Sequence, residues 1–395
     1  MISGREFSLT AKDKKIAISL MVLGVAAIAY GFYQDPTRGW VNLFVNTIYF
    51  LSIGMAALFL MSVGYLTGAC WWVGMRRVLE AIMTIIPVMG LLMLALYFGA
   101  KVLYPWARPE VVALDHVIHA KAGWYNVPFF FARMAVILAV WYGFAAMIRK
   151  VSLTQDTAPG PLSTEAVQSH RKLKKISAIF IPVFALTFTL ATFEWMMSIE
   201  PRWYSTIYAI YNFSALFLHG TAVIALAVIV LRERGYLEGI VNENHTHDLA
   251  KIILAFGTFW VCMWVNQYML IWYSNIPEEV TYFVLRLDRD WIWLFYLNII
   301  INWLVPFGIL IIRKSKRSFS VLKRVCILML VGHWIDLYVQ LAPPILKTRS
   351  IGLVEVLTSL GFGALFVYVV GTALARRPLL AVNDPRLEES LHHHQ

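Results

Sequence analysis

The stretch around which the rest of the chain is organised is Phe193-Glu-Trp-Met-Met-Ser-Ile-Glu-Pro-Arg-Trp-Tyr204, at the end of an apolar run that begins near Ile176. Glu194 falls inside this run, about two helical turns before Pro201. A carboxylate at that depth is costly in lipid and usually faces a protein interior or a water path. The alternative is that Glu194 lies close enough to the helix end to reach interfacial water. We interpret much of the remaining chain as a scaffold for such buried polar groups.

The composition is typical of a polytopic membrane protein. Of the 395 residues, 59% are hydrophobic and only 14% are charged, and the mean hydropathy is +0.66, which no soluble domain of this length shows. The first 15 residues are polar and basic and contain no cleavage site of the Ala-x-Ala kind, so we expect no cleaved signal peptide. The net charge of +11 lies in loops, where it reports topology and not binding to nucleic acid.

The three cysteines do not form a ligand set. Cys70, Cys262 and Cys326 are far apart, no Cys-x-x-Cys pair occurs, and no Cys-x-x-Cys-His motif is present. We therefore expect no iron–sulfur, zinc or covalent haem site in this chain. The C-terminal stretch from Leu391 to Gln395 is polar, and we expect it to be disordered and to carry no site.

Ten apolar segments are long enough to span a bilayer, which takes about 20 residues. With ends uncertain by a few residues, they are 15–33, 41–67, 77–100, 125–148, 176–199, 205–231, 250–274, 291–312, 320–341 and 351–375. We number the segments 1 to 10 in this order. Pro87, Pro182 and Pro306 lie inside segments 3, 5 and 8, where we expect kinks. The chain divides into an N-terminal segment, residues 1–14, a ten-helix membrane domain, residues 15–375, and a C-terminal tail, residues 376–395.

The basic residues predict the orientation. The N-terminus, the even-numbered loops and the C-terminus carry 24 of the 34 lysines and arginines, the odd-numbered loops carry nine, and Arg133 lies inside segment 4. The positive-inside rule then places both termini in the cytoplasm. The odd-numbered loops are instead rich in acidic residues, among them Asp288. These acidic residues either are simply solvated, dock a partner, or lead protons to or from the helices.

Two weak internal matches suggest a repeat. Thr47-Ile-Tyr49 followed by Ala57-Leu-Phe-Leu60 recurs as Thr206-Ile-Tyr208 followed by Ala215-Leu-Phe-Leu218, and Glu194 precedes Pro201 by seven residues as Asp336 precedes Pro343. Parallel repeats of this kind predict two four-helix bundles. Segments 2–5 (about 41–199) form the first bundle and segments 6–9 (about 205–341) the second, with segments 1 and 10 peripheral. Glycines in segment 10 allow close helix packing.

Few ionisable residues fall within the predicted helices. The candidates for a proton path are Glu80, Arg133, Glu194, His219, His333 and Asp336 in the helices, and Asp288 in the loop before segment 8. His333 and Asp336 are three residues apart and so share one helix face. Asn266, Gln267, Asn298 and Asn302 are possible relay positions.

Three interpretations of these buried groups compete. The first is structural, with Arg133 paired to Glu194 or Asp336. The second is a proton route, since carboxylates and histidines at membrane depth commonly carry protons. The third is haem b ligation by His219 and His333, whose expected depths differ. No phosphate-binding loop, dinucleotide fingerprint or nucleophile elbow occurs, and solute transport stays open. We expect Glu194, His333 and Asp336 to face one interior.

The motifs resemble a known family. The stretch from Phe193 to Thr206 is similar to a motif of the large membrane subunits of alternative complex III. Gln267-Tyr-Met-Leu-Ile-Trp-Tyr-Ser-Asn-Ile-Pro-Glu-Glu279, Gly332-His-Trp-Ile-Asp-Leu-Tyr338 and Asn302-Trp-Leu-Val-Pro-Phe307 resemble motifs of its F subunit. The resemblance runs from about segment 2 to segment 10. The family more often has Asp where this chain has Glu194.

The resemblance implies a membrane subunit of the polysulfide-reductase type within a quinol:electron-acceptor oxidoreductase. It implies that this subunit carries no cofactor and contributes a proton path beside a quinol-binding subunit. The implied partners are that subunit, an iron–sulfur protein, multihaem and monohaem cytochrome c subunits and lipids, with menaquinone or ubiquinone in the complex. One alternative is a purely structural scaffold. The other is that this chain itself binds quinol near Arg133, His333 and Asp336, beside aromatic segment 7.

Overall fold

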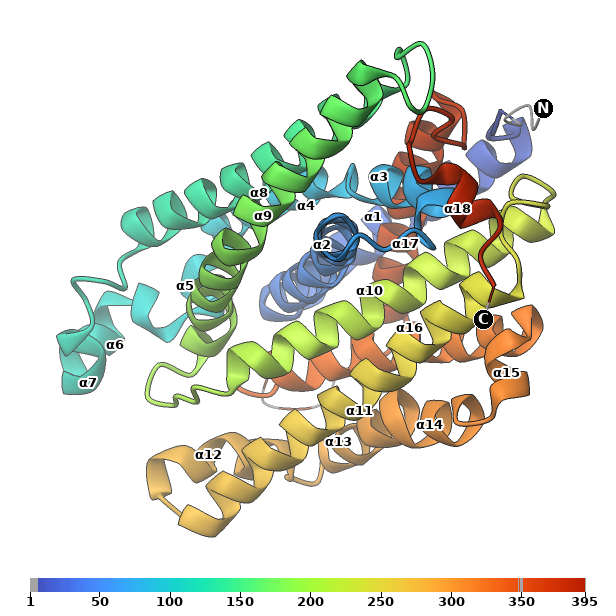
Figure 1. Ribbon diagram of the computed structural model, residues 1–395. Helices are drawn as coiled ribbons and strands as arrows, with labels where there is room; N and C mark the ends of the chain where they lie inside the picture. The colour runs from blue at the N-terminus through green and yellow to red at the C-terminus, as the bar shows by residue number, and fades with distance from the viewer. Residues whose placement is uncertain (1–5, 347, 349–350, 395) are drawn as a thin grey trace.

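The computed structural model is all-helical (Figure 1). It describes residues 6–346, 348 and 351–394, and within these residues there is no strand. Two of the basic residues counted above in the odd-numbered loops, Lys347 and Arg349, lie outside the described residues, as does Arg5. The long helices are α1 Ala11–Gln34, α2 Pro36–Thr67, α8 Val127–Gln155, α9 Thr164–Ala191, α10 Tyr208–Glu233, α11 Glu243–Ser274, α16 Phe319–Leu341 and α17 Leu353–Ala375. The shorter ones are α3 Arg76–Ile82, α4 Ile85–Ala95, α5 Ala100–Leu103, α6 Pro109–Leu114, α7 His116–Ala120, α12 Pro277–Arg286, α13 Ile292–Ile299, α14 Val305–Leu310, α15 Arg313–Arg317 and α18 Leu387–Leu391.

Nine helical segments in the described part of the chain are long and apolar enough to cross a membrane. They agree closely with nine of the ten predicted segments and identify a multi-pass membrane protein. The remaining predicted segment, 320–341, forms helix α16. Because α16 carries Lys323, Arg324, His333 and Asp336, it is less apolar than the other nine. The count of ten spans therefore stays a prediction.

Prolines and polar residues interrupt several of these helices. The third segment breaks between α3 and α4 just before Pro87, and α9 contains Pro182. Two π-helical turns, Thr192–Met196 and Ile300–Leu304, end α9 and join α13 to α14. Such turns widen a helix locally and are frequent at functional positions. Each of the two carries a buried polar residue, Glu194 in the first and Asn302 in the second.

Helices α2 and α10 are the most buried, and the other helices pack around them. On one side α2 contacts α4 and α9, and α8 packs against both of these helices. On the other side α10 contacts α11 and α16, and α13 and α14 pack against α16. Helices α1 and α17 pair along their length at the edge, where a Cβ atom added at Gly24 would lie 2.5 Å from the Cα of Gly361.

The start of α1 and the short helix α18 near the C-terminus lie at one end of the helices, which we call the termini face (Figure 1). The other end, the opposite face, carries α6, α7 and α12. The predicted long loop between segments 3 and 4 is structured on this face. Trp106 donates a hydrogen bond to Ser198 at 3.2 Å, and Lys121 donates one to the carbonyl of Pro201 at 2.6 Å. The loop is thereby fastened over the end of α9.

The C-terminal tail is packed against the termini face, so the expected disorder of its last residues is wrong for those that are described. The ring of His393 lies 2.7 Å from a carboxylate oxygen of Asp248 at the start of α11. Further back in the tail, Asp384 is fully buried and forms an ion pair with Arg76 at 2.5 Å. Buried ionic groups of this kind hold the tail, although it is polar in sequence.

Candidate functional site

The candidate site is a chain of buried polar groups between α10, α13 and α16. It begins at His219, which lies near the middle of α10 and is 1% exposed. The ring of His219 stacks on that of His333 from α16, with centroids 4.4 Å apart. The Nδ1 atom of His333 lies 3.8 Å from an oxygen of Asp336, one turn further along the same helix. These three groups therefore form a row through the interior. Within it, His333 and Asp336 share one face of α16, as their spacing predicted.

Three side chains donate hydrogen bonds to the carboxylate of Asp336, which is 1% exposed. Tyr211 donates its hydroxyl and Asn298 its amide, at 2.7 Å, to one oxygen, and Gln340 donates to the other at 3.0 Å. Asn302 in turn donates to the amide oxygen of Asn298 at 2.6 Å. A buried carboxylate is tolerated when hydrogen bonds replace water in this way. The polar residues predicted on segment 8 as relay positions, Asn298 and Asn302, are thus brought to the site.

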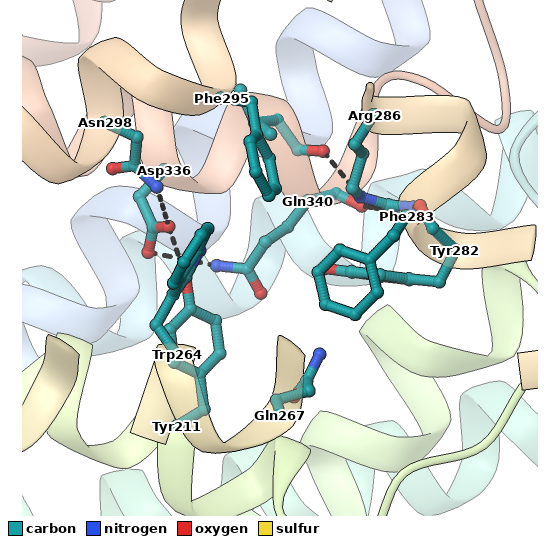
Figure 2. Close-up of a pocket in the computed structure, with 11 residues that line it drawn as sticks. Tyr211, Trp264, Gln267, Tyr282, Phe283, Arg286, Phe295, Asn298, Asp336 and Gln340 are labelled. Atoms are coloured by element: carbon teal, nitrogen blue, oxygen red, sulfur yellow. Dashed lines mark hydrogen bonds between the residues drawn. The ribbon is translucent and has the colours of Figure 1, made fainter. Parts of the chain in front are cut away.

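A small cavity adjoins Asp336 (Figure 2). Its volume is about 10 Å³, which is about enough for one water molecule. Tyr211, Gln267, Asn298 and Gln340 line it together with aromatic side chains. The amide oxygens of Gln267 and Gln340 have no hydrogen-bond partner among the described residues. A polar cavity of this size with unsatisfied acceptors suits a water that bridges buried groups.

The cavity ends at Arg286, the last residue of α12, which is 1% exposed. Its guanidinium donates to the carbonyls of Val339 and Gln340, at 3.0 and 2.6 Å, and to the carboxylate of Glu200 at 2.8 Å. Glu200 belongs to the loop before α10 on the opposite face and is partly exposed. The row of polar groups thus runs from His219 to a carboxylate that solvent reaches.

Glu194 lies outside this row. Its carboxylate accepts a hydrogen bond from Arg133 at 2.7 Å, and the guanidinium of Arg133 also packs over Trp124 and Phe129. These contacts come from α8, the loop before it and the π turn after α9. The contacts of Asp336 come from α10, α13 and α16. The expectation that Glu194 shares one interior with His333 and Asp336 is therefore wrong, and the expected pairing of Arg133 with Glu194 is present.

Glu80 is placed in a separate ionic cluster at the termini face. Its carboxylate accepts hydrogen bonds from Arg76 at 2.9 Å, from Arg77 at 2.5 Å and from Ser152. Arg76 also pairs with the tail residue Asp384. This cluster links α3, α8 and the C-terminal tail. We therefore interpret it as a structural ion-pair network.

Asp288 is exposed in the turn between α12 and α13, where its backbone carbonyl accepts from Trp291 and Ile292. Its side chain therefore lies outside the row. The members of the row that the sequence did not reveal are Tyr211, Gln340, Arg286 and Glu200. Among the described residues no three His, Cys, Asp or Glu side chains gather in a way that would hold a metal ion.

No protein-family model and no curated protein sequence matches this chain.

Proposed function

We propose that this chain is an integral membrane subunit of a respiratory or photosynthetic quinol:electron-acceptor oxidoreductase and that it conducts protons beside a quinol-binding subunit. The observation that carries the proposal is the row of buried groups from His219 through His333 and Asp336 to the Arg286–Glu200 pair. Histidine and carboxylate side chains at membrane depth are the usual carriers of protons. The membership of the complex comes from the resemblance of the motifs.

The cavity beside Asp336 favours proton transfer over quinol binding. A volume of about 10 Å³ admits a water but not a quinone ring. The alternative quinol site also requires Arg133 beside His333 and Asp336, whereas Arg133 is engaged with Glu194. We further propose that the helix contacts around α2 and α10 correspond to two four-helix bundles with α1 and α17 peripheral.

The partners follow from the same proposal. The complex would contain a quinol-binding subunit of the polysulfide-reductase type, an iron–sulfur protein and cytochrome c subunits, which hold the haem and iron–sulfur centres. Menaquinone or ubiquinone would be the electron donor. We place the complex in a bacterial inner membrane, with both termini of this chain in the cytoplasm.

Isolation of the chain from native membranes in mild detergent tests this proposal. The affinity tag belongs at the N-terminus, because the C-terminal tail is buried against Arg76. We expect haem and iron–sulfur proteins to co-purify in fixed proportion and the preparation to oxidise quinol. A chain that is isolated alone from membranes with intact quinol oxidation would contradict the proposal.

A further inference from the structure

A second small cavity lies at the termini face, between α3, α8 and α17, with a volume of about 10 Å³. Its charged lining consists of three arginines, Arg77, Arg149 and Arg377, and a single carboxylate, that of Glu80. The remaining walls are apolar or proline side chains and come from the same three helices and the start of the tail. The lining therefore combines a surplus of guanidinium groups with an apolar surround.

The carboxylate of Glu80 does not neutralise this surplus. It already accepts from Arg76, Arg77 and Ser152. Within the described residues, the side chains of Arg149 and Arg377 donate no hydrogen bond and form no close ion pair, and Arg377 only attracts the carboxylate of Asp156 from a greater distance. The acidic residues bonded to the inner arginines, Asp156 to Arg77 and Asp384 to Arg76, do not line the cavity.

The side chain of Arg77 provides an independent indication that the cavity can accept a ligand. Its side chain is only 4% exposed, and two of its nitrogens are bonded to Glu80, Ser152 and Asp156. Its Nε atom is buried and has no hydrogen-bond partner in the described structure. Buried donors are rarely left unpaired, since their desolvation is then uncompensated. An acceptor oxygen in the cavity would satisfy this donor.

The surroundings of the cavity indicate a lipid. It lies where α8 and α17 leave the apolar part of the structure, at the face predicted to be cytoplasmic. Tyr142 and Phe366 lie seven residues before Arg149 and Ala373, two turns deeper on the same helix faces, and both remain partly exposed. An acyl chain lying on these aromatic rings would keep its phosphate at the arginines. Guanidinium groups match phosphate oxygens in geometry and charge.

We propose that this cavity binds the phosphodiester group of an anionic phospholipid. One phosphate oxygen enters the cavity and accepts from the Nε of Arg77, while Arg149 and Arg377 flank the remaining oxygens at the mouth. The site is separate from the row of groups at Asp336. The proposed lipid binding therefore does not depend on the proposed proton path.

The test compares two double variants of the full chain that change the charge equally. R149Q/R377Q removes two lining arginines that donate no side-chain hydrogen bond within the described residues. K150Q/R376Q removes the exposed neighbouring residues on the same helix and helix end, which do not line the cavity. Arg77 is left intact because it pairs with Glu80 and Asp156.

Native mass spectrometry of the purified protein, titrated with phosphatidylglycerol or phosphatidylcholine in mixed micelles, measures the binding. We expect the native chain to retain one phosphatidylglycerol in preference to phosphatidylcholine. R149Q/R377Q should weaken this binding roughly tenfold, while K150Q/R376Q should change it by less than about twofold. Equal losses in the two variants, or displacement of phosphatidylglycerol by excess inorganic phosphate, would overturn the proposal.

Discussion

The imidazole ring of His219 is held between two other rings, and its contact with His333 is made face to face, with the planes inclined by 28°. Tyr49 from α2 lies 4.3 Å from His219 by ring centroids. Neither ring nitrogen of His219 has a hydrogen-bond partner within the described residues. His219 is therefore positioned by packing, and its nitrogens stay available for proton exchange.

Replacing His219 by phenylalanine tests this arrangement. The new ring keeps the stacking and removes two unsatisfied nitrogens, each of which costs about 1–3 kcal/mol when buried. We expect the free energy of unfolding of His219→Phe in detergent to stay equal or rise. His333→Phe is the comparison, since it removes the nitrogen next to Asp336 and should destabilise the protein. A clear loss of stability in His219→Phe would mean that its nitrogens are bound.

The Arg133–Glu194 pair predicts a non-additive effect on stability. Glu194→Gln leaves Arg133 as an uncompensated charge with only 11% of its side chain exposed. Such a loss costs about 3 kcal/mol when one partner of a buried pair is removed, and removing both partners costs less. We expect the double variant with Arg133→Gln to be more stable than Glu194→Gln alone.

Thermal unfolding of the three variants measures this coupling. If the effects of the two substitutions simply add, the pair does not stabilise the helices. A role of Glu194 in carrying protons would then be favoured over a structural role.

The contact between α1 and α17 depends on Gly361. A Cβ atom there would lie 2.6 Å from the Cα of Gly24, closer than packed atoms approach, whereas at Gly363 the nearest atom would be 3.9 Å away. We expect Gly361→Ala to lower the free energy of unfolding by about 1–3 kcal/mol through overpacking. Gly363→Ala is the matched control on the same helix. Equal stability of the two variants would show that α1 can shift away from α17 without cost, so that the close contact at Gly361 does not stabilise the protein.

The loop on the opposite face should respond to acid. A hydrogen bond from Arg202 at 2.7 Å holds the pKa of Asp115 below its ordinary value of 3.8. Because the pKa is lower in the folded protein, the ionised carboxylate stabilises the loop above about pH 4, and this contribution is lost as the pH falls through the lowered pKa.

Hydrogen exchange of residues 109–124, corrected for its intrinsic pH dependence, measures this effect. We expect constant protection from neutral pH down to about pH 5 and a loss below about pH 4. Arg202→Gln should lower the protection at neutral pH and weaken the further fall. Unchanged protection of the native loop at the lowest pH would contradict the assignment.

Most of the helices could be predicted from the lengths of the apolar segments and from the positions of the polar residues within them. The segment around His219 formed one long helix, and His333 and Asp336 share a face as their spacing predicted. Contacts between side chains on segments distant in sequence could not be predicted from these features. Arg286 ends a short helix after α11, and nothing in its local sequence indicates that it folds under the carbonyls of α16.

The same limit applies to Glu194 and the tail. Glu194 and Asp336 stand at the same distance from a proline, which suggested a common interior, but side-chain partners decide which interior each one faces. The tail pairs through Asp384 with a residue 308 positions earlier, and a contact so distant in sequence leaves no periodic signal.

The proposed proton path depends on Asp336, and the hydrogen bonds of this residue permit a conservative substitution. Asp336→Asn preserves the size of the side chain. Of the three donors Tyr211, Asn298 and Gln340, only the amide of Gln340 would then face another donor, and its free oxygen can take its place by a rotation of the amide. The substitution therefore removes the ionisable proton and leaves the packing intact. Asp288→Asn, at the exposed turn, is the matched control.

Proton release by the complex reconstituted in liposomes, measured together with the rate of quinol oxidation, tests the role of Asp336. We predict that Asp336→Asn assembles and oxidises quinol but releases fewer protons per quinol, down to those that the oxidation of quinol itself liberates, because a side chain that carries protons at membrane depth is lost, while Asp288→Asn matches the native complex. Full proton release by Asp336→Asn would contradict a proton-carrying role of Asp336. The alternative that this chain is a purely structural scaffold would then be favoured. Loss of quinol oxidation itself in an intact complex would contradict the proton-carrying role in favour of quinol binding at Asp336.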